Sequence, residues 1–352
     1  MIVAIHPDDY ATPTSGGPDS SSPRWTRLLE DAGHHVRQVD VFRADILSQL
    51  RGCDGFMWRH AHIPLHRQVA RRLLPVIEKE LGIAVYPDQN TCWHYDDKIT
   101  QYYLLTAANI PAPRTWVWFD YEQAMHWIES ATFPLVIKLW SGSASTNVRM
   151  VHDHEQAVQW IRKLFTHGVA DMNELSGKGT AEFIARLRRA ARVILRGAGV
   201  GRPWELHRNY LLAQEFINGN DFDTRVVIIG NRAFAKRRFN RPGDFRASGC
   251  RNIDCNPARI DMRAVRLAFR TAQRLGAQSL ALDILRRGEE FLVVEISYTY
   301  PSYAQYECPG HWELKDDEVV WIEGRMWPEE AQIEDFLVRL EEKHDSRSLL
   351  CV

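Results

Sequence analysis

Apolar residues follow two different spacings over the first 90 positions of the chain. Short apolar runs bounded by polar and turn-forming residues indicate buried strands, and apolar residues three and four positions apart indicate amphipathic helices. The pattern predicts strands at 2–5, 36–41 and 55–58, and helices at 25–33, 44–50 and 69–82. Because strands and helices alternate, we expect a small parallel α/β domain over residues 1–95.

Two further units follow, and each mixes helices with strands. The first, residues 96–209, is expected to contain helices at 97–108, 121–130 and 155–165 and strands at 115–118, 135–139 and 148–151. The second, residues 210–352, is expected to contain strands at 211–217, 224–229, 233–238, 280–285 and 290–296, and helices at 261–275 and 328–343. The fold class is therefore α/β, with a parallel amino-terminal domain followed by two α+β domains.

The composition of the 352 residues is that of an ordinary globular protein, with 45% hydrophobic and 25% charged residues. Lys and Arg total 44 against 45 for Asp and Glu, so the net charge of −1 predicts no general attraction to nucleic acid or membrane. No uncharged stretch approaches the ~20 residues that cross a bilayer, the first residues do not resemble a secretory signal, and the cysteines are scattered. We expect a cytoplasmic protein, and a homodimer is among the assemblies that the sequence allows.

A lysine at the end of an apolar strand precedes a loop of small residues. Lys138 is followed by Ser-Gly-Ser-Ala-Ser at positions 141–145. The amides and hydroxyls of such a loop can close over a polyphosphate without steric conflict, and the lysine supplies positive charge. The alternative is a surface lysine, which is the usual place of this residue type.

Two other apolar strands each carry one carboxylate. Asp283 lies within the run 280–285, and Glu295 ends the run 291–295. If these strands are antiparallel neighbours, the carboxylates need a cation between them, because buried charge is costly without compensation. Magnesium is the natural cation, since it accepts carboxylates and completes its coordination with phosphates and water. Pairing with nearby arginines is the structural alternative.

Four segments in their order along the chain resemble the ATP-grasp superfamily, especially its branch with glutathione synthetase and the ribosomal-protein glutamate ligases. The resemblance covers residues 96–297. The segments are Asp97-Lys98 with Ile-Pro-Ala-Pro-Arg-Thr at 110–115, Phe-Pro-Leu-Val-Ile-Lys at 133–138, Gln-Glu-Phe-Ile-Asn-Gly at 214–219 with Asp223-Thr224-Arg225, and Asp283 with Glu295-Ile296-Ser297. The resemblance implies two grasping α+β domains that sandwich ATP.

The resemblance also implies roles for individual residues around the nucleotide. The phosphates would be held by Lys98, Lys138, Ser141, Gly142 and Ser143. The adenine would lie beside the backbone of Gln214, Glu215, Phe216 and Ile217, with Gln214 or Glu215 near its amino group. Either Asp221 or Asp223 would meet the ribose hydroxyls.

The same resemblance places magnesium on Asp283, Glu295 and Ser297. Ser297 departs from the family pattern, in which an asparagine supplies the third ligand, so we expect a second ion to be held weakly. Arg246 and Arg225 would face the acyl phosphate, where a fixed guanidinium neutralises the charge that grows in the transition state.

The implied function is an ATP- and Mg²⁺-dependent carboxylate–amine ligase that acts through an acyl phosphate. Its substrates would be a carboxylate, on a small molecule, peptide or sugar, and a nucleophile. The alternatives are an ATP-grasp kinase for a small-molecule acceptor and a nucleotide-binding protein without turnover. The loop 12–23, the insert 172–208 and the tyrosine-rich segment 298–306 are expected to line the acceptor pocket.

Two features fit the family pattern less well. The insert 172–208 contains a helix with a basic face, which is either solvated or a receptor for an acidic substrate. Cys250, Cys255, Cys308 and His311 would ligate zinc if their two loops converged. The loose spacing makes zinc the less favoured interpretation.

Overall fold

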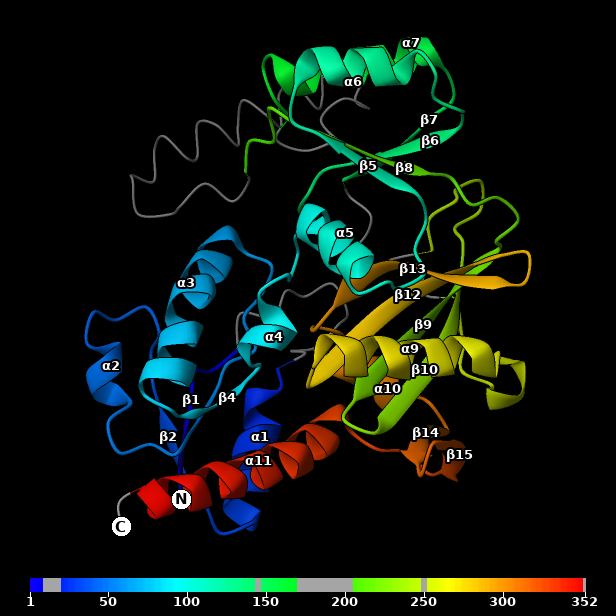
Figure 1. Ribbon diagram of the computed structural model, residues 1–352. Helices are drawn as coiled ribbons and strands as arrows, with labels where there is room; N and C mark the ends of the chain where they lie inside the picture. Colours follow the sequence, from blue (N-terminus) through cyan, green and yellow to red (C-terminus); the bar gives the residue numbers. More distant parts are fainter. Residues whose placement is uncertain (9–19, 143–146, 170–204, 248–251, 351–352) are drawn as a thin grey trace, which may run out of the picture.

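The computed structural model describes residues 1–8, 20–142, 147–169, 205–247 and 252–350. The described chain is built around three β-sheets. In Figure 1 the amino-terminal sheet lies at the left, the central sheet at the top and the carboxy-terminal sheet at the right. This arrangement of one parallel α/β unit and two α+β units confirms the predicted fold class.

The amino-terminal sheet has four parallel strands in the order β2-β1-β3-β4. Its strands are β1 (Ile2–Ile5), β2 (His35–Gln38), β3 (Gly55–Met57) and β4 (Ala84–Tyr86), and its helices are α1 (Ser22–Asp31), α2 (Ile46–Gln49), α3 (Pro64–Pro75), η1 (Val76–Glu80) and α4 (Gln89–Cys92). Successive residues of β1 point to opposite faces, so Val3 and Ile5 join one core cluster and Ala4 the other. Both faces of the sheet are therefore covered.

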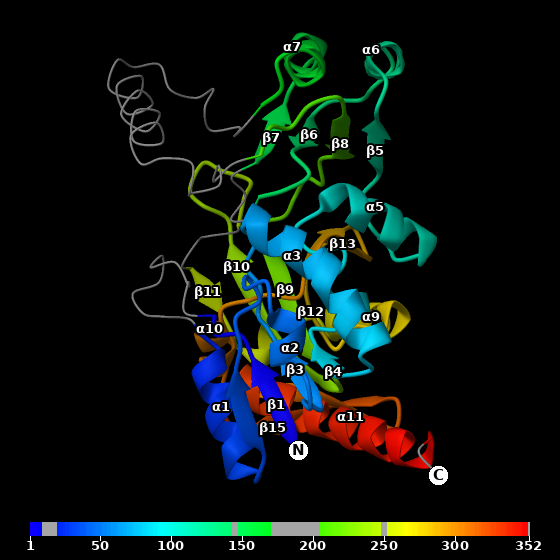
Figure 2. The same cartoon turned by 90° about the vertical axis from the view of Figure 1, so that its left-hand side faces the viewer.

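The terminal helix α11 (Pro328–Leu350) packs against this amino-terminal unit, and in Figures 1 and 2 it runs close to α1. Its apolar stripe, Ile333, Phe336 and Leu340, shares a core cluster with Trp25 of α1. The Trp25 indole also donates a hydrogen bond to Gln332 Oε1 at 2.8 Å. The two ends of the chain thus stabilise one unit.

The central sheet is antiparallel, in the order β5-β8-β6-β7. Its strands are β5 (Thr115–Trp118), β6 (Leu135–Lys138), β7 (Val148–Val151) and β8 (Leu211–Glu215), and the helices α6 (Tyr121–Ile128) and α7 (His154–Phe165) cover its outer face in Figure 1. Asp120 and Asp153 cap the two helices, each accepting a hydrogen bond from the backbone N–H three residues on. Because β8 pairs with both β5 and β6, residues 211–215 lie in the central sheet, beyond the expected boundary at 209–210.

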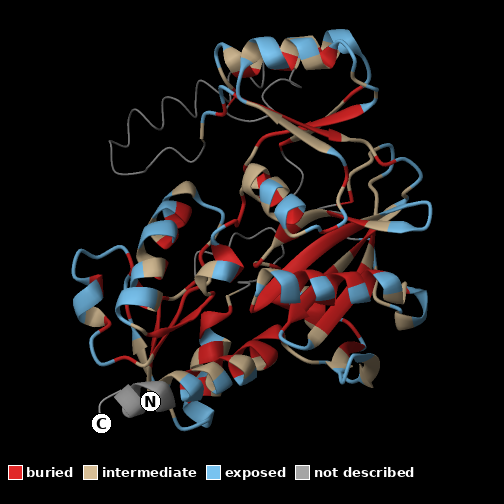
Figure 3. Ribbon diagram, in the orientation of Figure 1, coloured by how far each residue is buried: buried red, intermediate tan, exposed pale blue. Residues whose placement is uncertain are grey.

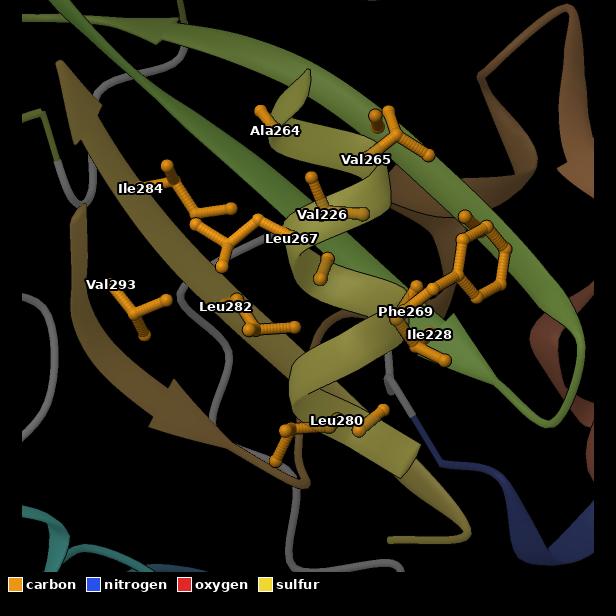
Figure 4. Packing of buried hydrophobic residues seen from close by; sticks show 14 of the residues in the cluster. Val226, Ile228, Ala264, Val265, Leu267, Phe269, Leu280, Leu282, Ile284 and Val293 are labelled. Carbon is orange, nitrogen blue, oxygen red and sulfur yellow. The ribbon is translucent and has the colours of Figure 1, made fainter. Parts of the chain in front are cut away.

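The carboxy-terminal sheet has seven strands, six of them in the order β13-β12-β9-β10-β14-β15, with β11 paired to β10. Its elements are β9 (Phe222–Ile229), β10 (Arg232–Phe239), β11 (Ile253–Asp254), η3 (Pro257–Arg259), α9 (Met262–Leu275), β12 (Ser279–Arg287), β13 (Glu290–Ser297), α10 (Ser302–Tyr306), β14 (Gly310–Lys315) and β15 (Glu318–Glu323). Helix α9 begins at its cap Asp261 and ends at Gly276, whose φ of 60° suits glycine. Figure 4 shows its apolar face on β9 and β12, with Phe269 among the buried side chains.

Helix α5 (Lys98–Ala107) lies between the central and carboxy-terminal sheets in Figures 1 and 2. The Gln101 amide donates to the carbonyl of Ile296 at 2.8 Å and accepts from its N–H, and Leu105 belongs to the carboxy-terminal core. The first residues of α5 are therefore held close to the end of β13. Figure 3 shows the buried residues concentrated in the sheets and on the inner faces of the helices. Within the described ranges, no helix is long and apolar enough to span a bilayer.

Candidate nucleotide and metal site

The two lysines expected to bind the phosphates come from different elements, and both interact with the charge of Glu295. Lys138 is the last residue of β6, and Lys98 is the first residue of α5 after the capping Asp97. The Lys98 ammonium donates to the carbonyl of Gly142 at 2.8 Å and lies 3.4 Å from Glu295 Oε1. Burial lowers the pKa of Lys138 to about 8, although the negative charge of Glu295 opposes that shift.

A cavity of about 440 Å³ opens between the central sheet and α5. Both lysines line it, together with Thr115 and Gln214 of the central sheet and Val293 of β13. This volume lies within the range of small-ligand sites, and its lining combines apolar and cationic groups as a nucleotide site requires. The structure therefore brings Lys98, Lys138 and Gln214 together as predicted from the sequence.

The small-residue loop begins in a conformation that depends on glycine. Gly142 has a φ of 121°, and a Cβ atom there would lie 2.5 Å from the side-chain nitrogen of Asn147. That same nitrogen donates to the carbonyl of Ser141 at 2.8 Å, which closes the base of the loop. Ser143, the third predicted loop residue, lies outside the described residues.

The expected adenine segment follows the central sheet, but its side chains have different surroundings. Gln214 donates to Thr115 Oγ1 at 2.9 Å on the cavity side. The Glu215 carboxylate instead accepts from Arg114 and from Arg287, the latter at 2.7 Å. Of the two candidates for the adenine amino group, Gln214 is the residue that lines the cavity.

The remaining residues of this segment and its turn lead into the carboxy-terminal sheet. Phe216 packs edge-on against Phe245, with their ring centroids 5.7 Å apart, and Ile217 is buried. Asp221 is exposed, whereas Asp223 is buried and bound by Arg238. Asp221 is therefore the more accessible of the two candidates for the ribose.

The predicted carboxylates lie opposite each other, with Asp283 on β12 paired to Glu295 on β13. Arg225 makes two hydrogen bonds to Asp283, at 2.7 and 2.8 Å, and Arg238 makes a third contact at 2.8 Å. Burial raises the pKa of Asp283, but the two arginines outweigh it and hold this pKa well below its usual range. The arginine pairing that the sequence left as an alternative is thus present at Asp283.

The three residues expected at magnesium differ in how well they fit that role. Asp283 and Glu295 offer the hard oxygen atoms that magnesium prefers. Ser297 donates from its hydroxyl to the carbonyl of Thr299 at 3.0 Å and accepts from the Thr299 N–H at 3.1 Å. Among the described residues no group of three or more His, Cys, Asp or Glu side chains is gathered to hold a metal. Asp283 and Glu295 are thus the carboxylates that could hold the ion, and Asp283 would have to exchange its arginine contacts for it.

Arg246 pairs with a residue of its own loop. Its guanidinium donates to both carboxylate oxygens of Asp244, at distances from 2.6 to 2.9 Å. The role of Arg246 at the acyl phosphate stays a prediction, and the neighbouring residues 248–251 lie outside the described chain.

The sequence analysis did not single out Arg238 as a site residue. Arg238 binds Asp223 and Asp283 together and so connects β9, β10 and β12. The signal was the alternation along β10, where Lys236 and Arg238 are both buried on one face. Two buried cations two residues apart in a strand require carboxylate or carbonyl partners. Asp223 and Asp283 meet that need for Arg238, and Lys236 donates to the carbonyl of Ala304 and to Gln305 Oε1.

Three of the four residues considered for zinc are described in the structure: Cys255, Cys308 and His311. Cys250 lies outside the described residues, and the thiols of Cys255 and Cys308 are hydrogen-bonded to each other. The His311 ring stacks on Phe234, and its Nε2 atom lies 3.1 Å from Glu313 Oε1. The two loops thus converge at Cys255 and Cys308, whereas His311 contacts Phe234 and Glu313, and zinc at this place stays a prediction.

Comparison with solved structures identifies the fold as that of the ATP-grasp ligases. D-cycloserine synthetase DcsG superposes with a TM-score of 0.58 at 14% identity, covering 97% of this chain and 100% of that one. A RimK domain ATP-grasp protein from Sphaerobacter thermophilus gives a TM-score of 0.53 at 17% identity, covering 96% of this chain and 100% of that one. The amino-terminal unit is included in both matches.

The family profile described as "RimK-like ATP-grasp domain" matches residues 95–171 and 145–301, more than half of the chain, and the protein belongs to this family. The α-aminoadipate–LysW ligase LysX of Saccharolobus solfataricus is 20% identical over 225 residues, which are 64% of this chain and 69% of that enzyme. The ribosomal protein bS6–L-glutamate ligase of Salmonella paratyphi B is 30% identical over 122 residues, which are 34% of this chain and 40% of that enzyme. The class predicted from the sequence, an ATP-dependent amide-forming ligase, is confirmed, and a kinase is not favoured.

Proposed function

We propose that the protein uses ATP and magnesium to convert a substrate carboxylate into an acyl phosphate, which an amine then attacks to form an amide. The observation that carries the proposal is the convergence of Lys98 and Lys138 at one cavity, with the carboxylate of Glu295 3.4 Å from the Lys98 ammonium. This arrangement supports the proposal because phosphates bind to cations and a phosphate-bound metal binds to carboxylates.

Each group has a separate task in this proposal. Lys98 and Lys138 bind the nucleotide phosphates beside the loop that starts at Ser141. Asp283 and Glu295 would hold magnesium, which supplies neutralisation of phosphate charge when it is bound. Ser297 is turned toward Thr299, so we assign its coordination place to water or phosphate oxygen.

The reaction itself needs positioning more than covalent chemistry by the protein. A carboxylate oxygen attacks the γ-phosphorus of ATP, the bond to the β,γ-bridging oxygen breaks, and ADP leaves. The amine nitrogen then attacks the acyl carbon, loses a proton, and expels inorganic phosphate. Arg225 and Arg246 are the cations that we assign to the charge developing in these steps, and Arg225 already contacts a site carboxylate.

The substrate class follows from chemistry and from the named relatives. LysX is named for joining α-aminoadipate to LysW, and the Salmonella enzyme for adding glutamate to a ribosomal protein. We propose that this protein likewise joins an amino acid to a partner that is a small molecule or a peptide. The identity of both substrates is left to experiment.

Hydroxylamine trapping tests the proposal without knowledge of the natural amine. Amino acids and peptides are offered as carboxylates together with ATP, magnesium and hydroxylamine, and hydroxamate and ADP are measured. Hydroxamate should form in amounts equal to ADP, and Lys138→Met and Glu295→Gln should each abolish both products. ADP release by wild type without any hydroxamate would reject the acyl phosphate and point to a kinase. Wild-type turnover in either variant would reject the assigned nucleotide site.

A further inference from the structure

An arginine of the amino-terminal unit reaches the start of the loop assigned to the nucleotide phosphates. Arg67 lies on α3, far in sequence from the loop, and only 4% of the residue is exposed. Its guanidinium lies 4.8 Å above the ring of Trp140, the residue that precedes the loop. An arginine held this way is fixed in position by stacking on the indole.

The two terminal nitrogens of Arg67 hold two different carboxylates. Nη1 donates to Asp96 Oδ2 at 2.5 Å and to the Asp96 carbonyl at 3.1 Å, and Nη2 donates to Glu205. Each carboxylate in turn contacts the loop. Asp96 Oδ1 accepts from the Gly142 N–H at 2.8 Å, and Glu205 accepts from the Ser141 hydroxyl at 3.3 Å.

Both backbone polar groups of Gly142 are therefore hydrogen-bonded to side chains. Asp96 accepts from its N–H, and Lys98, two residues further along, donates to its carbonyl at 2.8 Å. Asp96 itself has a φ of 52°, a left-handed conformation that is uncommon for a residue with a side chain. Such a conformation persists only where the surrounding contacts maintain it.

Arg67 is the cation that binds the Asp96 carboxylate directly. Burial raises the pKa of Asp96, and Lys98 and Arg67 oppose this shift. Without Arg67 the buried carboxylate loses its direct ion pair and keeps only the more distant charge of Lys98, which favours uptake of a proton or movement toward solvent. Both changes weaken its charge-assisted hydrogen bond to the Gly142 N–H.

We propose that Arg67 is a positioning residue for the nucleotide phosphates: through Asp96 and Glu205 it holds Ser141 and Gly142 in the conformation that binds them. The inference rests on the proposed function, because it takes the loop after β6 as the phosphate loop. It makes the amino-terminal unit a part of the nucleotide site, although that unit lies outside the matched family domain.

Nucleotide affinity measured by calorimetry tests this role, with ADP and adenosine as the two ligands. Arg67→Met should weaken ADP binding about 10-fold or more, because only a fraction of molecules would keep the loop in its binding conformation. Adenosine lacks phosphates, so its affinity should change less than twofold. Arg67→Lys should be intermediate, because lysine keeps the charge but loses the fork that reaches both carboxylates.

Arg71→Met is the matched control. Arg71 lies one turn further along α3 and pairs with Asp97 at 3.2 Å, next to Asp96, but it is exposed. An ion pair whose arginine is exposed contributes little, so ADP affinity should stay within about twofold of wild type. If Arg67→Met does not fold, the double variant Arg67→Met/Asp96→Asn, which removes both charges, takes its place with the same expectation.

Two results would overturn the inference. One is ADP affinity in Arg67→Met equal to wild type, and the other is an equal loss for ADP and adenosine, which indicates general damage. Lys138→Met separates this failure from failure of the proposed function. If Lys138→Met loses ADP binding while Arg67→Met keeps it, only the role of Arg67 is rejected. If Lys138→Met also binds ADP normally, the nucleotide site itself is misplaced.

Discussion

Lys138 gives the nucleotide site a pH dependence whose direction and size follow from the structure. Burial lowers the pKa of its ammonium to about 8, so near neutral pH the free protein carries this charge and above pH 8 it loses it. Bound phosphates stabilise the charged form. ADP should therefore bind with uptake of a proton above pH 8, and its affinity should fall as the pH rises.

The magnitude can be worked out from that pKa. The protonated fraction of a group with a pKa of about 8 falls from roughly three quarters at pH 7.5 to roughly one tenth at pH 9, so ADP affinity should weaken about eightfold. The assay is titration calorimetry with ADP in buffers containing EDTA, so that no metal contributes. Repeating it at pH 8 in buffers of different ionisation enthalpy should give an uptake of about half a proton per ADP.

Lys138→Arg identifies the titrating group. Lys236, buried beneath α10, also has its pKa lowered to about 8 by burial, so the wild-type curve alone does not distinguish the two lysines. An arginine at position 138 stays charged throughout this range, so ADP affinity should become nearly independent of pH, whatever its absolute value. A wild-type affinity that does not vary between pH 7.5 and 9, or an unchanged slope in Lys138→Arg, would refute the reasoning.

Three further predictions concern stability and reactivity. Asp283→Asn should lower the free energy of unfolding by about 3 to 5 kcal/mol, measured by urea denaturation, because buried Arg238 and half-buried Arg225 lose a carboxylate; a loss below about 1 kcal/mol would contradict their pairing. Burial lowers the pKa of His60 to about 3 and of His94 to about 4, so the folded state keeps both neutral while the unfolded state takes up protons below pH 6.5. Acidification from pH 7.5 to 5.5 should cost about 1.4 kcal/mol for each histidine, and His94→Gln should remove its share. A hydrogen bond from a neighbouring thiol lowers the pKa of Cys255 to about 7, so iodoacetamide at pH 7 should label Cys255 before buried Cys92, as peptide mass spectrometry can check.

The local elements of the fold could be predicted from the sequence because their signals are local. The strand expected at 135–139 is β6, and the Asn-Gly turn after residue 217 places Gly219 at a φ of 81°. Both depend on a few adjacent residues, an apolar run in one case and a residue that tolerates positive φ in the other. Lys138 could be proposed for the same reason, since it ends a recognisable strand before a loop of small residues.

The contacts between units could not be predicted from the sequence, because they join residues that are far apart along the chain. Helix α11 shows an apolar stripe, but nothing in the stripe says that it packs on Trp25, some 300 residues away. Strand β8 likewise gives no sign that it joins the central sheet, since pairing depends on strands formed almost 100 residues earlier. Arg67 shows the same limit at the site. It is one of several arginines on a helix, and only the fold brings it to Gly142.

Asp283 and Glu295 form ion pairs with cations, and they are also the carboxylates proposed to hold magnesium. The sequence could not distinguish these two roles. Asp283 and Glu295 were expected to compensate a metal, and in the structure they compensate Arg225 and Lys98. The two roles are compatible. Clustered cations in a binding site destabilise the folded protein unless carboxylates lie nearby. The same carboxylates are suitable ligands for a metal that binds together with the nucleotide phosphates. On the proposed function, a metal nucleotide would exchange these partners: its phosphates would bind the cations, and the carboxylates would hold its metal. The number of unpaired buried charges would then be similar in the free and the bound protein. A site of this kind can therefore contain many ionised groups and still bind and release its ligand.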